Sequence, residues 1–414
     1  MTLSHDHDLA REIIDHGLTT QDLGPRLAEP ARRAGAEEAT EEATEEVAAA
    51  APTRAAPRLP LHAHWPRPEL APRPRALPAE PRIFDPLPRA DYLVVTWTVA
   101  EQDALAAVLT PGVTRHHWHR YARGFERTYL PMIREGAPAR AAHRLGSYYL
   151  CEIGGASVLC FKSELHLNQD GIRRPSGGAT LPVKDLFKQL IAEVQPRLVI
   201  TVGTAGATFP EHDLGDVMIT RAARFRCQDE FQGAPFNGQT FASNYRIPTR
   251  WLDDARALLR HQDEMLVEPG FAPPTVRYPW QGPPLAGHRN RPTIRVEGGG
   301  GPGDLPAGLP ILTTDFFEFG TTANELWTQG CAVEMGDAVL GLAASELGGG
   351  APPWLVIRNA SDPAINAALP RSKVRQLDMQ SHWAVWYYEA FGFWTSVNSA
   401  IATWAIIAGE AAPQ

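Results

Sequence analysis

The acidic side chains that follow apolar segments are the residues of this sequence best suited to chemistry. Asp362 comes directly after "WLVIRNAS", which is apolar enough to form a buried strand. Burying an unpaired carboxylate is costly, so Asp362 must pair with a cation such as Arg358, cap the next helix, or have a function. In the functional case, burial raises the pKa of the carboxyl group, which then gives a proton to a ring nitrogen of a heterocycle.

Glu101 lies where the apolar segment "DYLVVTWTV" gives way to "AEQDALAAVL", whose spacing predicts a helix. As a structural residue, Glu101 would be stabilised by the positive end of the helix dipole. As a functional residue, it would be a general base that activates water. Phe316 and Phe317 follow a third apolar segment, "PILTT", and by default they are core residues, although one of them could offer a face for base stacking.

The segment "GTAGA" follows the apolar run "RLVITV" and is predicted to be a turn with exposed amides. Gly203 and Gly206 allow a close approach that a Cβ would prevent, so the turn could hold an anion, a water molecule or a sugar oxygen. No GxGxxG fingerprint follows this strand, and the sequence has no Gly-Lys-Ser/Thr loop or GxSxG elbow. We interpret His116, His117 and His119 as part of a solvated or lid-like helix, because no nearby acid or Cys completes a set of metal ligands.

Strand and helix patterns alternate from residue 91 onward, which predicts an α/β domain with a mainly parallel or mixed central sheet. In such folds, ligands bind beyond the carboxyl ends of the strands. Strands are predicted at 91–99, 147–152, 156–161, 197–207, 214–225, 310–319 and 354–360, and helices at 100–109, 181–194, 248–262, from about 322, from 333, and over 377–410.

Residues 1–85 differ in composition from the rest of the chain and are predicted to be a disordered leader. An acidic repeat, "EEATEEATEE", precedes a run rich in Ala, Pro and Arg, and few large apolar residues are available for burial. A short helix is expected only near residues 6–16. The leader either has no assignable role or is a partner-binding tail. Residues 270–310, rich in Pro and Gly, are predicted to be a long insertion loop.

The composition limits the classes of function. Hydrophobic residues make up 44% of the chain, enough for a sizeable core, and the net charge of −8 argues against nucleic acid and an anionic membrane surface as partners. We find no secretory signal and no run of about 18 apolar residues, so no membrane span is expected. The four Cys residues form no CxxC pair, which indicates reduced thiols in a cytoplasmic protein.

Four motifs in sequence order resemble the purine nucleoside phosphorylase / uridine phosphorylase superfamily. They are a strand followed by "AEQDAL", then "VITVGTAGA" with "LGDVMIT", then "TTDFFEF", and finally "AVEMGDAV" with "LVIRNASDP". The resemblance covers about residues 91–409, with insertions near 115–145 and 262–310, and the site pattern is most similar to methylthioadenosine/S-adenosylhomocysteine nucleosidase. It implies a three-layer fold with a central mixed sheet flanked by helices, and cleavage of the N-glycosidic bond of nucleosides.

The resemblance also implies a role for each matching residue. Asp362 matches the acid that protonates the purine leaving group at N7, and Ser361 matches the residue that holds this acid, a pair that indicates purines. Glu101 is similar to the carboxylate that activates water in the nucleosidases, although Asp103 can be aligned instead. The other matches contact the base, the ribose or the nucleophile: Phe317 packs on the base, Glu334 and Met335 lie beside the ribose, and Thr204, Ala205 and Gly206 meet the nucleophile and the sugar.

Two positions depart from the family pattern. The family usually reads Glu-Met-Glu, and its second Glu binds the ribose hydroxyls, but this chain has Gly336 there. The next acid, Asp337, lies about 100° further round the helix and is an imperfect substitute. Hexameric phosphorylases carry a phosphate-binding Arg two residues before the glycine of the turn, where this chain has Thr201. Arg173 or Arg174 from an insertion could replace that Arg.

The sequence therefore predicts a purine nucleosidase-like hydrolase that uses water as its nucleophile. Phosphorolysis to ribose 1-phosphate, with phosphate as a co-substrate, is the second candidate, and a non-catalytic purine-nucleoside-binding protein is the third. No cofactor or metal is expected. The resemblance implies a homo-oligomer, either a dimer or a hexamer, for which the aromatic C-terminal region could supply an interface.

Overall fold

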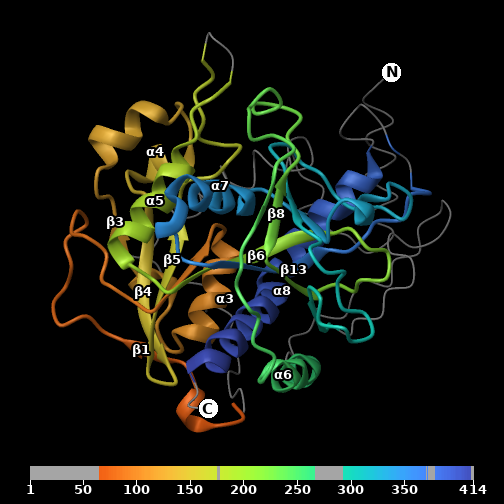
Figure 1. Ribbon diagram of the computed structural model, residues 1–414, viewed down its shortest axis with the longest axis horizontal. Coiled ribbons are helices and arrows are strands. Elements are labelled where there is room, and N and C mark those ends of the chain that lie inside the picture. The colour runs from red at the N-terminus through yellow and green to blue at the C-terminus, as the bar shows by residue number, and fades with distance from the viewer. Residues whose placement is uncertain (1–64, 175–177, 266–291, 370, 372–377, 412–414) are drawn as a thin grey trace, which may run out of the picture.

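A mixed β-sheet lies at the centre of the computed structural model, which describes residues 65–174, 178–265, 292–369, 371 and 378–411 (Figure 1). Its strands are β1 Arg73–Arg75, β2 Tyr92–Thr96, β3 His119–Tyr121, β4 Gly146–Ile153, β5 Ala156–Ser163, β6 Leu198–Ala207, β7 Val217–Thr220, β8 Ala222–Phe225, β9 Thr240–Ala242, β10 Ile294–Val296, β11 Ile311–Thr313, β12 Ala332–Glu334 and β13 Trp354–Asp362. Hydrogen-bonded neighbours follow the order β1-β4-β5-β2-β6-β12-β11-β8-β9, and β13 pairs with both β6 and β7.

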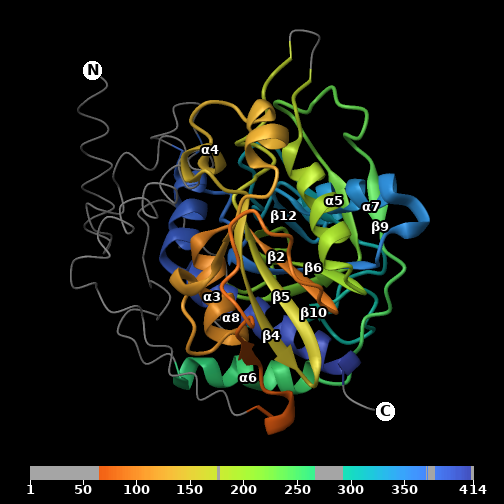
Figure 2. The same ribbon diagram turned by 90° about the vertical axis from the view of Figure 1, so that its left-hand side faces the viewer.

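Helices cover the sheet on both sides. They are α3 Val99–Leu109, α4 Pro138–Ala142, α5 Pro182–Val194, α6 Leu252–Met265, α7 Asp337–Leu347 and α8 Met379–Ala411. Figure 2 shows the sheet between two helical layers, with α3 and α8 on one side and α5 and α7 on the other. Each side has its own apolar core, one containing Leu186 and Leu340 and the other containing Leu105 and Ile401. The predicted α/β class, a mixed central sheet flanked by helices, is confirmed.

Strand β6 is the element around which the site is built. It runs parallel to β2 on one side and parallel to β13 on the other, from the pair Val199–Trp354 to the pair Gly206–Asp362, with a bulge in β13 just before Asp362. Since these strands share one direction, their carboxyl ends meet at the same edge of the sheet. Every residue of β2 is buried, because helices cover both faces, and this explains its continuous apolar sequence.

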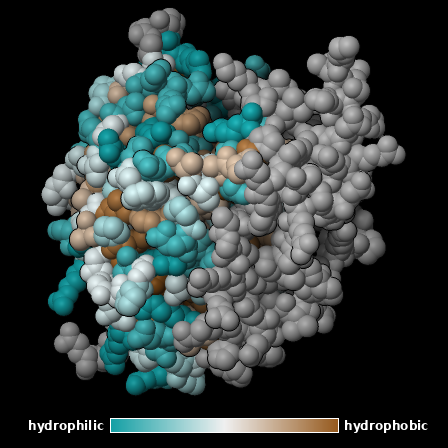
Figure 3. Space-filling view, turned by 90° about the vertical axis from the view of Figure 1, so that its right-hand side faces the viewer, coloured by the Kyte–Doolittle hydropathy of each residue, from teal (hydrophilic) through white to brown (hydrophobic). Residues whose placement is uncertain are grey.

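The C-terminal helix α8 is a core element. Its segment Phe391–Ala411 is long and apolar enough to cross a membrane, but 89% of its most apolar window is buried within the protein. Trp383 and Tyr387, in the first half of α8, are also buried in the chain's own core. The described part of the face in Figure 3 is mainly hydrophilic, with hydrophobic residues in a patch near its middle and in smaller areas above and below it.

The predicted leader boundary at residue 85 is too late, because the chain joins the fold from residue 65. A 3₁₀-helix, Pro68–Leu70, leads into β1, which pairs antiparallel with the edge of β4. The Trp65 ring lies 4.5 Å from that of Trp404 in α8, and the Trp404 indole nitrogen donates to the Leu70 carbonyl at 2.7 Å. Residues 1–64, including the predicted helix at 6–16, lie outside the described residues.

This early segment is expected to contribute to stability. Leu70 is 3% exposed and packs in the core beneath α8. Replacing it by Ala should lower the free energy of unfolding by about 2–5 kcal/mol, since the cavity left behind adds to the lost burial. Urea unfolding monitored by circular dichroism measures this change. Phe84→Ala is the matched control, because Phe84 is 62% exposed and should change stability little. Equal stability of both variants would place the segment outside the cooperative fold.

Four other predicted elements differ from the structure. The strand expected over 310–319 ends at Thr313, and where a helix was expected from 322 the chain forms only a 3₁₀-helix, Leu326–Thr328. The insertion predicted as a loop contains β10, which pairs with β7; its residues 266–291 are outside the described part. The three histidines lie on a 3₁₀-helix, Arg115–His117, and on β3 rather than on one helix. Short apolar runs leave strand and helix lengths ambiguous, and pairing partners decide them.

Candidate active site

A cavity opens at the carboxyl end of β6 and β13, and all of the sequence-predicted site residues line it. These residues are Glu101, Thr204, Ala205, Gly206, Phe317, Glu334, Met335, Ser361 and Asp362. They come from the start of α3, the end of β6, the segment after β11, the end of β12 and the end of β13. Side chains far apart in the sequence therefore converge as the strand-end rule predicts.

Asp362 is buried at the end of β13, where it has a single side-chain hydrogen-bond partner among the residues that the structure describes. Its exposed fraction is 7%, and the Ser361 hydroxyl donates to Oδ1 at 2.9 Å. A Cβ on Gly206 would lie 2.7 Å from Oδ2, so glycine is needed there for the carboxyl group to pack against β6. The alternative pairing with Arg358 is wrong, since that guanidinium binds other acids. Burial raises the pKa of Asp362 to about 8, so the group is largely protonated at neutral pH and able to donate.

Glu101 differs from Asp362, because several hydrogen-bond donors surround its carboxylate. Oε1 accepts from the amide and the hydroxyl of Thr204, each at 2.7 Å. Oε2 accepts from the Thr96 hydroxyl at 2.8 Å and from the amides of Trp97 at 3.0 Å and Thr98 at 2.9 Å. Burial alone would raise the pKa of Glu101, but Arg358 and these amides outweigh it and hold the pKa below its ordinary value. Glu101 is therefore ionised and in contact with Thr204.

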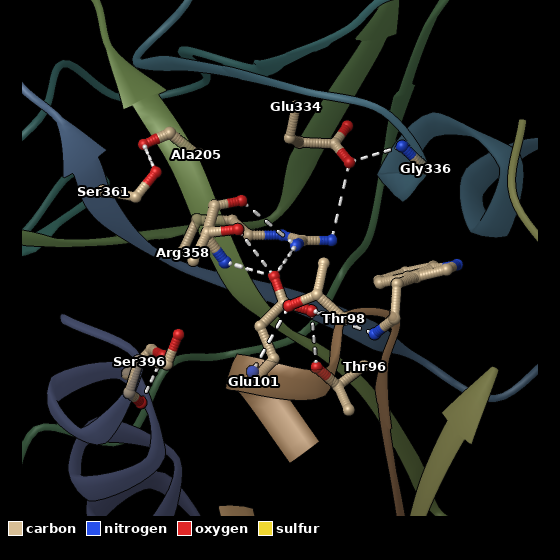
Figure 4. Close-up of polar contacts among 12 residues, drawn as sticks. Thr96, Thr98, Glu101, Ala205, Glu334, Gly336, Arg358, Ser361 and Ser396 are labelled. Atoms are coloured by element: carbon tan, nitrogen blue, oxygen red, sulfur yellow. Dashed lines mark hydrogen bonds and ion pairs between the residues drawn. The ribbon is translucent and has the colours of Figure 1, made fainter. Parts of the chain in front are cut away.

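Arg358 links the acids of the cavity and was missed as a site residue. Its guanidinium binds both oxygens of Asp337, through Nε at 2.9 Å and Nη2 at 2.7 Å. It also lies 3.7 Å from Glu101 and 3.5 Å from Glu334, and Figure 4 shows it between these two carboxylates. Burial opposes its charge, but the three acids together raise the pKa of Arg358. A signal was present in the sequence: an Arg inside a buried strand, four residues before Asp362, needs several anionic partners.

Glu334 and Met335 were predicted to open a helix, and this prediction is wrong. Glu334 is the last residue of β12, and Met335 lies between β12 and α7. Glu334 ends the strand and its carboxylate turns back to accept from the amides of Gly336 and Asp337, so that it caps α7 (Figure 4). Glu334 also accepts from the Thr313 hydroxyl. Burial and the neighbouring Asp337 raise the pKa of Glu334 to about 8. These bonds direct both carboxylate oxygens toward the protein.

The segment "GTAGA" is not a turn but the last part of β6. Gly203 pairs with Arg358, and Ala205 pairs with Ala360, because β13 continues alongside. Gly203 has a φ of 154°, and a Cβ on it would lie 2.2 Å from Glu101 Oε1. The glycine therefore serves the predicted close approach, but it does so within a strand. The small residues of this segment led to the prediction of a turn, because the sequence alone does not show that β13 pairs with it.

Several cavity residues carry no motif and were not predicted. Trp97 precedes α3, Tyr388 comes from α8, and His166, Asn168 and Gln169 follow β5. Burial and the charge of Lys162 lower the pKa of His166 to about 4, so its imidazole is neutral at neutral pH. The polar run "HLNQD" after an apolar strand was the available signal, since it lies at a strand end like the acids.

Other candidate residues lie outside the cavity. Asp103 pairs with Arg115 at 2.9 Å, and it does not line the cavity, whereas Glu101 does. The His119 ring lies 2.9 Å from the carboxylate of Glu80. No acid near this histidine was predicted from the sequence, because Glu80 is distant along the chain. Within the described ranges, no group of at least three His, Cys, Asp or Glu residues is arranged to hold a metal ion.

Comparisons with known proteins find similar structures. No family model matches the chain, and no curated protein matches it. A 5′-methylthioadenosine/S-adenosylhomocysteine nucleosidase from Neisseria meningitidis, in complex with methylthio-immucillin-A, has 15% identity and a TM-score of 0.41, over 77% of this chain and 98% of that one. Futalosine hydrolase of Helicobacter pylori strain 26695 has 11% identity and a TM-score of 0.40, over 76% of this chain and 97% of that one.

A third similar structure is a 5′-methylthioadenosine/S-adenosylhomocysteine nucleosidase from S. pneumoniae, with 16% identity and a TM-score of 0.40, over 77% of this chain and 99% of that one. The likeness is one of fold and is distant.

Proposed function

We propose that this protein hydrolyses the N-glycosidic bond of a purine nucleoside. The observation that carries the proposal is Asp362, a carboxyl group that burial keeps protonated near neutral pH, in one cavity with the ionised Glu101. A purine leaves as a stable molecule only when one of its ring nitrogens takes up a proton. A neutral carboxylic acid and an anionic carboxylate in one site are the pair that such a reaction needs.

In the proposed reaction, the bond between C1′ and the purine nitrogen breaks as Asp362 gives its proton to N7 of the base. The sugar carbon becomes oxocarbenium-like, and a water oxygen forms the new bond to C1′. The proton lost by this water passes to Glu101 and then to solvent, while Asp362 regains a proton from solvent. The products are the free purine and the sugar with a hydroxyl at C1′, so that atoms and charge balance.

Glu101 needs an opening for the water, since both of its oxygens already accept hydrogen bonds. The hydroxyls of Thr96 and Thr204 can be exchanged more easily than the amides, because each rotates about one bond, and of the two only Thr204 lines the cavity. We propose that the water binds between the Thr204 hydroxyl and Glu101 Oε1. Arg358 lies 3.7 Å from the same oxygen, and its charge keeps the carboxylate ionised until it takes the proton from the water.

The proposed base site lies at Phe317 and Ser361. Phe317 is partly exposed in the cavity, and its ring lies 5.6 Å from that of Phe319, so it offers a supported aromatic face on which a purine packs. Ser361 orients the acid through its bond to Asp362. A carboxylic acid at a purine ring nitrogen fixes both the position and the orientation of the base.

Water is favoured over phosphate because the cavity offers few donors for an anion. Arg358 is the sole Arg or Lys among the described cavity residues, and acids already surround it. Arg173, which the sequence suggested as a replacement, is 62% exposed and pairs with Asp229 at 2.9 Å, away from the cavity. The Thr201 hydroxyl is buried. Phosphate binding needs several strong donors directed at one point.

A screen of nucleosides with and without phosphate tests the proposal. Purified full-length protein is incubated with adenosine, inosine, their 2′-deoxy forms, methylthioadenosine and S-adenosylhomocysteine, and products are identified by mass spectrometry. We expect free purine and free sugar at a rate independent of phosphate. A sugar 1-phosphate that forms only with phosphate would establish the phosphorylase instead. Nucleoside binding without any product would establish the non-catalytic candidate.

The pH dependence of base release should identify Asp362 as the acid. The reaction needs the protonated form, so activity is present below its pKa of about 8 and is lost as the pH rises through that value. Glu334 has a similar pKa, so a variant must separate the two. The Ser361 hydroxyl lowers the pKa of Asp362, and Ser361→Ala should move the basic limb of kcat/KM to higher pH. A limb that stays in place in this variant would assign it to another group.

A further inference from the structure

The space in front of Gly336 is filled by the Trp97 indole. A Cβ on Gly336 would lie 3.0 Å from Trp97 Cζ2, 3.2 Å from Cε2 and 3.4 Å from Cη2. The φ of Gly336 is −162°, which any residue adopts, so it is the indole and not the backbone that would crowd a larger side chain. Trp97 is 6% exposed, with its ring edge-on to Phe187 at 6.1 Å and the Arg358 guanidinium 4.8 Å from its centroid. The wall is therefore aromatic and fixed.

The acids beside this wall are already engaged by the protein. Asp337 is fully buried and binds Arg358 through both oxygens. Glu334 accepts from the amides at the start of α7 and from Thr313. Glu101 accepts from the start of α3 and from Thr204. Glu101 and Glu334 would have to give up bonds before they could accept from two neighbouring sugar hydroxyls, and Asp337 is buried and does not line the cavity.

We propose that Trp97 and Gly336 determine the sugar, and that the site takes a purine 2′-deoxyribonucleoside in preference to the ribonucleoside. This inference rests on the proposed function and deepens it. A hydroxyl pressed against an aromatic wall loses water without gaining a partner, which weakens its binding roughly ten-fold or more. The C–H face of a 2′-deoxy sugar loses nothing there and packs on the indole.

The chemistry of the sugar points the same way. A 2′-hydroxyl withdraws electrons from C1′ and disfavours the oxocarbenium-like state, so ribonucleosides need more stabilisation from a site than 2′-deoxyribonucleosides do. A carboxylate that binds the 2′- and 3′-hydroxyls supplies such stabilisation, and the described wall offers an indole in its place. The less demanding sugar is therefore the one that matches this cavity.

Matched pairs of nucleosides test the inference. The ratio of kcat/KM is measured for 2′-deoxyadenosine over adenosine and for 2′-deoxyinosine over inosine. We expect a ratio of about 10–100 in the parent, since an apolar wall rejects an added hydroxyl only to this degree. Trp97→Ala should lower the ratio, and the part that remains reflects the intrinsic reactivity of the two sugars. The double variant Trp97→Ala/Gly336→Glu has room for the new carboxylate and should favour adenosine. Trp327→Ala, a change of an exposed Trp outside the cavity, should leave the ratio unchanged.

Binding measurements separate this inference from the proposed function. If no base is released, calorimetry with the same pairs gives the ratio of Kd values instead. Binding of the 2′-deoxy member at least ten-fold more tightly, without turnover, would reject hydrolysis and keep the sugar preference. A ratio near or below one in either measurement overturns the preference, even if hydrolysis occurs. Failure of every nucleoside to bind overturns both.

Discussion

The Asp362→Asn variant is expected to release purine at least about 10²–10⁴-fold more slowly than the parent, which is the usual worth of a general acid. Asn has the same shape as Asp, and its amide oxygen can still accept from the Ser361 hydroxyl. What it lacks is the acidic proton that the leaving base needs. Single-turnover base release with saturating enzyme measures the chemical step separately from binding.

The fold of this variant should remain intact. Burial disfavours the ionised form of Asp362, whose pKa is about 8, so the carboxyl group costs stability as the pH rises from its ordinary value toward 8. A neutral amide carries no such cost. The free energy of unfolding of Asp362→Asn should therefore equal or exceed that of the parent at pH 8. A large loss of stability would mean that lost activity cannot be assigned to the missing proton.

A substrate with a different leaving group is the sharper control. A 4-nitrophenyl glycoside of the preferred sugar releases 4-nitrophenolate, an anion that needs no proton to leave. Asp362→Asn should therefore cleave this substrate at nearly the parent rate. Glu101→Gln should instead impair both substrates, since water must attack in each case. If Asp362→Asn lost activity equally on both substrates, Asp362 would not be the acid, and its role would be to position the sugar or the base.

The sequence was sufficient to predict features that depend on one continuous segment of the chain. Asp362, Ser361 and Glu101 were found because an acid after an apolar strand is conspicuous, and the carboxyl ends of parallel strands share one edge. The pairing between strands that are distant in the sequence could not be predicted. "GTAGA" was predicted to be a turn because nothing in its own residues shows that β13 runs beside Gly203 and Ala205.

Long-range contacts explain the remaining errors. Arg358 was considered only as a partner of Asp362, since the convergence of acids from α3, β12 and α7 on one guanidinium depends on the folded sheet. Trp65 and Leu70 lie in a Pro-rich stretch that is typical of disorder, yet they pack against α8, more than 300 residues away. Composition describes a segment alone, whereas burial depends on what the rest of the chain brings to it.

Replacing Arg358 by Met is expected to cause the largest loss of stability among the variants proposed. Arg358 is 3% exposed, and its charge is balanced by the buried acids Asp337 and Glu101. Without it, at least one buried carboxylate lacks its partner, which costs about 3–5 kcal/mol of the free energy of unfolding. Urea unfolding at pH 7 measures this loss. Arg173→Met is the matched control, since the exposed pair with Asp229 contributes only about 0–1 kcal/mol.

The pH dependence of the loss tests its cause. Lowering the pH protonates the acids that Arg358 no longer balances, so the stability difference between Arg358→Met and the parent should shrink toward pH 5. If the lost packing of the side chain were the cause, the difference would be the same at both pH values.

Arg358→Lys separates charge from geometry. A lysine keeps the positive charge but cannot form the two parallel bonds to Asp337, and it reaches Glu101 and Glu334 less well at the same time. Stability should therefore recover in large part. Base release should stay low, because Glu101 is no longer held beside Thr204 in the position that binds water. Full recovery of kcat by Lys would show that Arg358 acts as a charge alone and does not position Glu101.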